Sequence, residues 1–335
     1  MATSHCLVTW SISHHLTPQE DKAWNEWVAQ QGPVFNHTAF AQACRCIGFI
    51  PRYAIESDHS RAIFYTKSVG PAWLKLEWVV FFSEPSYPPE ISEAAKTIHA
   101  RALIQLLRLK NPATLGTIGS MARFPVPVDN SSDLLQIPFG TYQMDLSKTE
   151  EALWAAVHSK HRNAIRAGEK QNVSVGLETD WHAFYVFLKD TLTRAGEACP
   201  PESYLKEAAQ GLHPHGACQL WVAKHQSQWQ AAALLLLTPE RAYYWFGATT
   251  KEPATGAGNL LHWTIIKELK KSGVLVYDLG GARPHLSQDS KLYSIQRFKE
   301  RFGGTYHEFP QWKIVHGAFR SKILQMLFQI KSLLP

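Results

Sequence analysis

The sequence predicts an α+β protein of two domains, each built on a mixed, mainly antiparallel sheet flanked by helices. The chain has 335 residues, which is longer than a single hydrophobic core usually supports. Its two halves show the same order of elements, with helices first, then short strands, then another helix. A hydrophobic content of 45% and an aromatic content of 12% exclude general disorder.

The first half opens with a helix whose start is specified by a capping box. Thr17 can cap the first turn, Pro18 suits the first helical position, and Glu20 can return a hydrogen bond to the cap. Patterning then predicts helices over 38–47 and 89–110 and strands over 52–56, 62–67 and 76–82. The proline- and serine-rich stretch 125–133 is a loop, so we place the domain boundary shortly after it, near Tyr142.

The second half repeats this order. Its predicted helices cover 150–171, 181–196 and 201–211, and its predicted strands cover 219–224, 230–237 and 242–248. A further helix begins at the cap Asn259 and stops at Gly273. A buried strand then carries Asp278 to a Gly-Gly turn, and an aromatic, basic helix follows it. The end of the chain has an amphipathic period typical of a helix that packs on a domain or lies on a membrane surface.

Bulk properties indicate a soluble protein of the reducing cytoplasm. The longest apolar run, Ala231 to Leu237, is far shorter than a membrane span, and the N-terminus lacks the pattern of a signal peptide. The five cysteines have no disulfide-like spacing. Cys44 and Cys46 lack a second pair with metal-ligand spacing, so we expect two small buried side chains and no metal site.

Positive charge is concentrated in two places. The segment from Lys291 onward carries eight Lys or Arg against two Glu, which equals the net charge of +6 of the whole chain. His158, Arg162, Arg166 and Lys170 recur every four residues and would share one helical face. The helical face suits an anionic substrate, and the basic end of the chain suits a polyanionic partner or an anionic membrane surface. A solvated charged face is the other interpretation in both places.

Three segments, 158–175, 243–249 and 259–304, resemble the Fem aminoacyltransferases (the FemABX family). The resemblance implies two GNAT-like domains, residues 1–142 and 143–310, with a C-terminal helix over 311–335 that completes the first. It also implies transfer of an amino acid from aminoacyl-tRNA to a peptidoglycan precursor, with no cofactor beyond that co-substrate. No helical hairpin is inserted between Arg194 and Gln219, so the coiled-coil arm of some relatives is not expected.

The same resemblance implies roles for particular residues. Lys299, which follows Phe298, would stabilise the negative oxygen of the tetrahedral intermediate. Asp278 is either a general base or an acceptor of backbone hydrogen bonds in the turn. Arg194 would hold the acceptor's anionic part, although a helix-end arginine also fits. The expected substrate-binding residues are Arg194, Tyr244, Phe298 and Arg45, and the expected tRNA- or phosphate-binding residues are Lys160, Arg162, Arg166, Lys170, Arg297 and Arg301.

Two other functions fit parts of the sequence. Gly256-Ala257-Gly258 precedes a helix, as does the pyrophosphate-binding loop of coenzyme A-dependent N-acyltransferases, although Pro253 departs from that pattern. A GNAT-like binding module without activity is the third interpretation. For the favoured aminoacyltransferase we expect a monomer in the cytoplasm, with peripheral contact to the inner face of the plasma membrane as an option.

Overall fold

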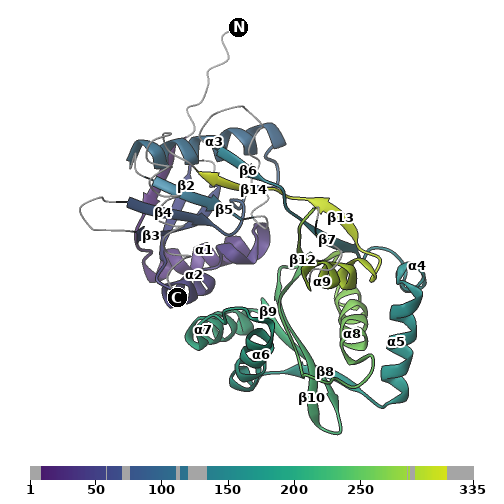
Figure 1. Ribbon diagram of the computed structural model, residues 1–335. Coiled ribbons are helices and arrows are strands. Elements are labelled where there is room, and N and C mark those ends of the chain that lie inside the picture. The colour runs from purple at the N-terminus through teal and green to yellow at the C-terminus, as the bar shows by residue number, and fades with distance from the viewer. Residues whose placement is uncertain are drawn as a thin grey trace. The chain divides into compact units, whose positions relative to one another are not determined.

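The computed structural model describes residues 9–57, 59–69, 76–110, 114–119, 134–284, 286 and 291–314 (Figure 1). The chain divides into two compact units, which are described one at a time. The first comprises Met1–Pro138 and the segment from Phe309 onward, and the second comprises Phe139–Glu308. No helix among the described residues is both long enough and apolar enough to cross a membrane.

The first unit contains a seven-stranded sheet in the order β1-β2-β3-β4-β5-β14-β6, in which only β4 and β5 run parallel. Its helices are α1 (Pro18–Gln31), α2 (Thr38–Arg45) and α3 (Glu93–Lys110), with a 3₁₀ turn η1 (Val34–Asn36). Its strands are β1 (Trp10–Ser13), β2 (Ile50–Glu56), β3 (Arg61–Val69), β4 (Leu76–Phe81), β5 (Thr114–Ile118), β6 (Leu134–Ile137) and β14 (Gln311–Ile314). Leu103, Ile104 and Leu107 of α3 pack into the core of this sheet.

Two expectations for the first unit need correction, and two are confirmed. The capping box at Thr17 and Glu20 forms as predicted. Residues 311–314 form strand β14 between β5 and β6 instead of starting a helix, and 315–335 lie outside the described residues. The strand is favoured because Trp312 and Ile314 alternate with Lys313 and are buried. Cys44 is buried as expected, whereas Cys46 is exposed.

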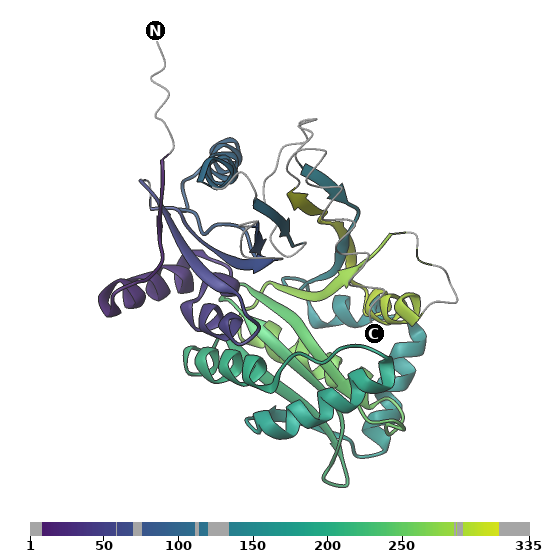
Figure 2. The same cartoon turned by 60° about the vertical axis from the view of Figure 1, so that its left-hand side comes forward.

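The second unit contains another seven-stranded sheet, in the order β13-β7-β12-β11-β10-β9-β8. Its strands are β7 (Gly140–Asp145), β8 (Ser174–Glu178), β9 (Cys218–His225), β10 (Gln228–Leu237), β11 (Arg241–Thr249), β12 (Val276–Ala282) and β13 (Thr305–Glu308). Its helices are α4 (Glu150–Ala156), α5 (Ser159–Lys170), α6 (Trp181–Ala195), α7 (Glu202–Leu212), α8 (Ala257–Lys271) and α9 (Lys291–Glu300), with a 3₁₀ turn η4 (His213–His215). Helices α5 and α8 cover one face of the sheet, and α6 and α7 cover the other (Figures 1 and 2).

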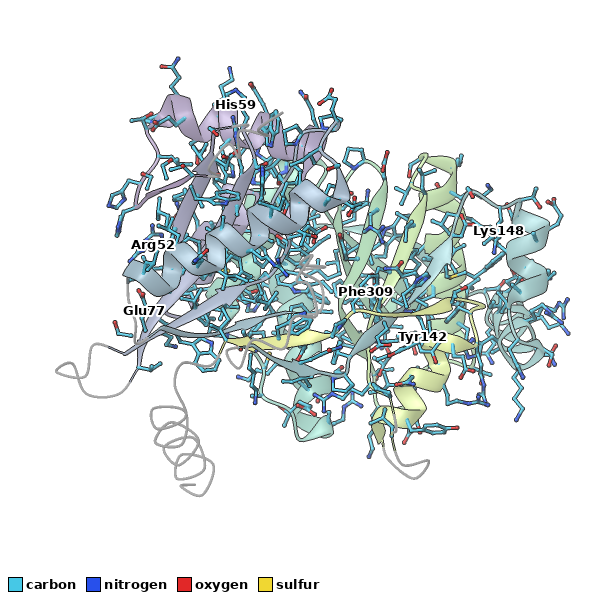
Figure 3. All side chains as sticks on the ribbon, turned by 90° about the horizontal axis from the view of Figure 1, so that it is seen from above. Arg52, His59, Glu77, Tyr142, Lys148 and Phe309 are labelled. Atoms are coloured by element: carbon cyan, nitrogen blue, oxygen red, sulfur yellow. The ribbon has the colours of Figure 1, made fainter. Side chains whose placement is uncertain are left out.

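Strand β7 places the start of the second unit a few residues before the predicted boundary near Tyr142. It lies between β13 and β12 in the second sheet. Tyr142, labelled in Figure 3, pairs across the strands with Tyr306 of β13, and their ring centroids are 5.7 Å apart. The predicted strands 219–224, 230–237 and 242–248 correspond to β9, β10 and β11. Helix α8 begins at Ala257, earlier than the expected cap Asn259, and Gly273 ends it in a left-handed conformation as predicted.

The earlier start of α8 follows from a close contact between its first turn and α5. Gly256 caps the helix at φ +81°, and a Cβ added there would lie 1.9 Å from the carbonyl oxygen of Ala164. Gly168, which like Ala164 belongs to α5, also faces Gly256. By contrast, a Cβ on Gly258 would meet no heavy atom within 4 Å. Packing therefore requires glycine at Gly256 but not at Gly258.

This difference predicts opposite effects of two alanine substitutions. Gly256→Ala should lower the free energy of unfolding by at least about 2 kcal/mol, because it adds left-handed strain and a backbone clash. Gly258→Ala should leave it unchanged or raise it by up to about 1 kcal/mol, because alanine favours helix. Urea unfolding of both variants measures the two effects. Equal stabilities would contradict the packing of α8 on α5.

Candidate active site

The candidate active site lies where strands β11 and β12 part. These parallel strands are paired at Arg241 with Val276, Ala242 with Tyr277 and Tyr243 with Asp278, and their pairing ends there. Beyond this point β11 continues along β10, with a register shift near Leu234, and β12 continues along β7. Beyond this point the backbone N–H and C=O groups of β11 and β12 no longer pair with each other. We call this point the β11/β12 fork.

A buried carboxylate shapes one arm of the fork. Asp278 is 4% exposed, and its Oδ1 accepts hydrogen bonds from the Thr141 hydroxyl and from the Gly280 backbone N–H at 2.9 Å. Its Oδ2 accepts one from Nε2 of Gln143 at 2.8 Å. Thr141 and Gln143 both belong to β7, so the carboxylate ties β12 to β7 across the register shift between Asp278 and Gly281. The turn glycines are held in place, with Gly280 at φ +79°.

Lys299 is the cation at this turn. Its half-buried side chain comes from α9, and Nζ donates a hydrogen bond of 3.0 Å to the carbonyl oxygen of Gly281. A Cβ on Gly280 would lie 3.5 Å from Nζ, an ordinary van der Waals contact, so glycine is required there by its left-handed φ of +79° and not by the ammonium. Burial lowers the pKa of Lys299 to about 8, although the charge of Asp278 acts in the opposite direction. The ammonium is therefore poorly solvated and still mostly protonated at neutral pH.

An aromatic cluster supports α9 behind Lys299. His262 of α8 lies between the rings of Tyr244 (centroids 4.7 Å apart), Phe302 (5.3 Å) and Phe298 (5.5 Å). Its Nδ1 lies 3.0 Å from the hydroxyl of Tyr277. The predicted substrate-binding residues Tyr244 and Phe298 thus meet beside Lys299. Burial raises the pKa of Tyr244 to about 12, so its phenol stays neutral.

His161 of α5 extends the same cluster. Its ring centroid is 4.7 Å from that of Phe302 and 5.1 Å from that of Phe298. Burial is the largest cause that lowers the pKa of His161 to about 4 and of His262 to about 3, and neighbouring cations add to it. Among the described side chains, Nδ1 of His161 is buried without a hydrogen-bond partner. Both imidazoles are therefore neutral at pH 7.

The predicted basic face on 158–170 is only partly present. The single helix expected over 150–171 is two helices, because Val157 is extended and His158 caps α5 instead of lying on its face. The guanidinium of Arg162 donates to the carbonyl oxygens of Ala155 (3.1 Å) and Val157 at the end of α4. Arg162 therefore caps a helix. Lys160, Arg166 and Lys170 are exposed, as a phosphate-binding role requires.

The remaining predicted arginines lie in different surroundings. Arg194 forms an ion pair of 2.9 Å with Asp190 and also donates to the Thr249 carbonyl, so its guanidinium joins the end of α6 to the end of β11. Arg45 is exposed at the last turn of α2, in the first unit. Arg297 pairs with Glu300 at 3.1 Å. Arg301 is half-buried, and its carbonyl oxygen accepts from the N–H of His158 at 2.8 Å, which docks the end of α9 on α5.

Comparison with known proteins identifies the fold. Residues 157–293 match the family model described as an acetyltransferase (GNAT) domain. The structure is similar to a crystal structure of FemX, with a TM-score of 0.70 and 16% identity over 95% of this chain and 99% of that one. The chain has the two-domain fold of GNAT-like acyltransferases. The predicted fold class and the resemblance to Fem-type proteins are both confirmed at this level.

Two further solved structures share this GNAT-like architecture. The C-terminal domain of a putative lysylphosphatidylglycerol synthetase from Agrobacterium fabrum has a TM-score of 0.59 and 13% identity, over 92% of this chain and 96% of that one. A tandem GNAT protein from the clavulanic acid biosynthesis pathway has a TM-score of 0.50 and 12% identity, over 92% of this chain and 99% of that one. No curated protein sequence matches this chain.

Sequence reasoning missed four residues of the candidate site. His161 and His262 occupy core-facing positions of α5 and α8, and histidines on an apolar helical face are a signal that could have indicated them. Thr141 and Gln143 carry no comparable signal, since they lie in a short strand more than a hundred residues from Asp278. Among the described residues, no group of three or more His, Cys, Asp or Glu could hold a metal ion.

The buried neutral histidines predict loss of stability in acid. Their pKa values are lower in the folded protein than in the unfolded chain, so stability is present above pH 6.5 and falls as the pH drops toward 4. His161→Phe should reduce the loss between pH 7 and pH 5 by roughly 1–2 kcal/mol. Urea unfolding at the two pH values measures this. The matched change at exposed His14, His14→Phe, should leave the loss unaltered, and equal losses in all three proteins would contradict the prediction.

Proposed function

We propose that this protein is an aminoacyltransferase that moves an amino acid from aminoacyl-tRNA to an amine of a peptidoglycan precursor peptide. The observation that carries the proposal is the desolvated Lys299 ammonium, held at the Gly280–Gly281 turn beside the β11/β12 fork. The similarity of the fold to FemX supports it. Such an enzyme would be a cytoplasmic monomer, with peripheral contact to the inner membrane face where its acceptor is lipid-linked.

The chemistry needs one fixed positive charge near the ester. The acceptor amine attacks the carbonyl carbon of the aminoacyl ester, and the carbonyl oxygen becomes negative in the tetrahedral intermediate. The Lys299 ammonium stabilises this oxygen. Collapse breaks the bond to the ribose oxygen, which takes up the proton that the amine gives up, and an amide remains. A pKa of about 8 leaves Lys299 protonated at neutral pH and able to relay this proton.

Asp278 has a positioning role in this scheme. Both of its oxygens already accept hydrogen bonds, from Thr141 and Gly280 on one side and from Gln143 on the other. These three donors hold the carboxylate in one orientation. It fixes the turn against which Lys299 is held, and its negative charge helps to keep Lys299 protonated.

The donor would be held by exposed positive charge on α5. Lys160 projects from the N-terminal turn of this helix, and the end of α9, which carries Arg297, docks on the same turn, whereas Arg166 lies over Trp154. Backbone phosphates of RNA are bound chiefly by such cations. The acceptor's anionic group would approach Arg194, whose guanidinium is already oriented by Asp190 and Thr249.

A coenzyme A-dependent N-acyltransferase is the second candidate. The match of 157–293 to a GNAT acetyltransferase model favours it, as does the open space around Gly258 in the first turn of α8. Pyrophosphate binds well to free backbone N–H groups at a helix start. Gly256 packs closely against the carbonyl oxygen of Ala164, so a ligand has little room beside Gly256. A bound pyrophosphate would therefore have to lie on the side of Gly258.

Removing the Lys299 ammonium should abolish most of the activity. Lys299→Met should reduce kcat at least about a hundredfold, the loss seen when one oxyanion donor is removed. In the wild type kcat/KM should fall as the pH rises through about 8, and this descending limb should disappear in the variant. Steady-state assays across pH 6–10 measure both effects. Lys271→Met, at a lysine that is 78% exposed, is the matched control, and near-normal turnover of Lys299→Met would exclude Lys299 from the chemistry.

A donor competition distinguishes the two candidate functions. Radiolabelled aminoacyl-tRNA should transfer its amino acid to a precursor peptide, and acyl-coenzyme A should neither bind nor compete. Gly258→Glu should have little effect on this transfer, because the added carboxylate enters open space. Saturable binding of acyl-coenzyme A that Gly258→Glu abolishes and Gly258→Ala preserves, without transfer from tRNA, would establish the second function instead.

A further inference from the structure

Helices α4, α5 and α8 together line an open surface pocket of about 370 Å³. Its residues come from the first turns of α4, the second half of α5 and the middle of α8. None of them is among the side chains that contact Lys299 or Asp278 at the β11/β12 fork. Trp263 follows His262 directly on α8, so the helix presents one residue to the fork cluster and the next to this pocket. We call it the α4–α5–α8 pocket.

Two tryptophans provide the aromatic wall of this pocket. The ring centroids of Trp154 and Trp263 are 4.8 Å apart with an angle of 52° between their planes, and Trp263 is 5% exposed. The guanidinium of Arg166 lies 5.5 Å from the centroid of the Trp154 ring. The protein itself thus places a cation on this wall, and indole is the aromatic group that attracts cations most strongly. The position of Arg166 shows that this aromatic wall accepts a cation.

Opposite charges surround the aromatic wall. Glu150, Glu151 and Glu169 supply three carboxylates, and Arg166 and Lys267 supply two cations, which gives the lining a formal charge of −1. Within the described part of the chain, the side chains of Glu150, Glu169 and Lys267 form no ion pair or hydrogen bond. Three charged side chains that have no partner among the described residues therefore line one open, partly aromatic pocket.

We propose that the α4–α5–α8 pocket binds a free amino acid with a cationic side chain. Such a molecule carries two positive groups and one carboxylate, so its charge of +1 complements the lining. Its cations would meet the glutamates and the tryptophan faces, and its carboxylate would meet Lys267 and Arg166. This inference goes beyond the proposed transferase function and does not depend on it, because the pocket lies apart from Lys299.

Calorimetric titration with a set of related probes tests this assignment. L-Lysine should bind, whereas L-norleucine, which lacks the side-chain ammonium, and 1,5-diaminopentane, which lacks the carboxylate, should each bind at least threefold more weakly. The variant Glu150→Gln/Glu169→Gln should weaken lysine binding at least threefold, and Lys267→Met should remove the preference for lysine over 1,5-diaminopentane. Glu207→Gln, an exposed glutamate on α7, is the matched control.

Three outcomes would overturn the proposal. Equal binding of lysine and norleucine would show that the glutamates recognise no cation. Unaltered lysine binding by the double glutamate variant would place the ligand elsewhere. Equal binding of Nα-acetyl-L-lysine amide would show that the pocket takes a lysine side chain of a peptide, not a free amino acid. Binding is measured directly, so inactivity toward aminoacyl-tRNA leaves the test intact.

Discussion

The hydrogen bonds of the buried Asp278 carboxylate are the interaction on which the rest of the site depends. Three donors from β7 and from the turn converge on it, and this satisfies a charge that would otherwise be very costly to bury. The carboxylate joins β12 to β7 just where β12 leaves β11. It also accepts from the N–H of Gly280, and Lys299 donates to the carbonyl oxygen of the next residue, Gly281. One buried anion thus holds the turn to which the cation is bonded.

The neutrality of the histidine cluster follows from the same arrangement. A protonated His262 would place a second buried cation beside Lys299, and the charge of Lys299 is one of the causes that lower the pKa of His262. The aromatic rings of Phe298 and Phe302 exclude water from both imidazoles, so each stays uncharged. The positive charge around the cluster therefore comes from Lys299 beside His262 and from Arg301 beside His161. Electrostatic stabilisation of a developing anion is strongest in such a desolvated setting.

The sequence predicted those parts that local rules control. The Thr17 capping box, the left-handed stop at Gly273 and the apolar strand β10 all depend on residues close together in the chain. The break between α4 and α5 carries no Gly or Pro and was therefore not predicted. Strands β7 and β14 are defined by partners far along the chain. For the site, Lys299 and Asp278 came from the family resemblance and the Gly-Gly turn. The residues that support them could not be predicted, because contacts between two strands of a sheet leave no periodic pattern in the sequence.

The division of the basic residues changes the expected path of a polyanion. Arg162 is committed to the carbonyl oxygens at the end of α4, and Arg166 lies on Trp154 among the glutamates of the α4–α5–α8 pocket. An anion that followed α5 toward its C-terminal end would meet those carboxylates. None of the carboxylates that line the pocket lies at the N-terminal end of α5. Lys160 lies at that end, and α9 docks there through its contact with His158. For the proposed RNA donor, the favoured place of contact is therefore the α5–α9 junction, the end of the helix whose His161 packs on the aromatic cluster behind Lys299.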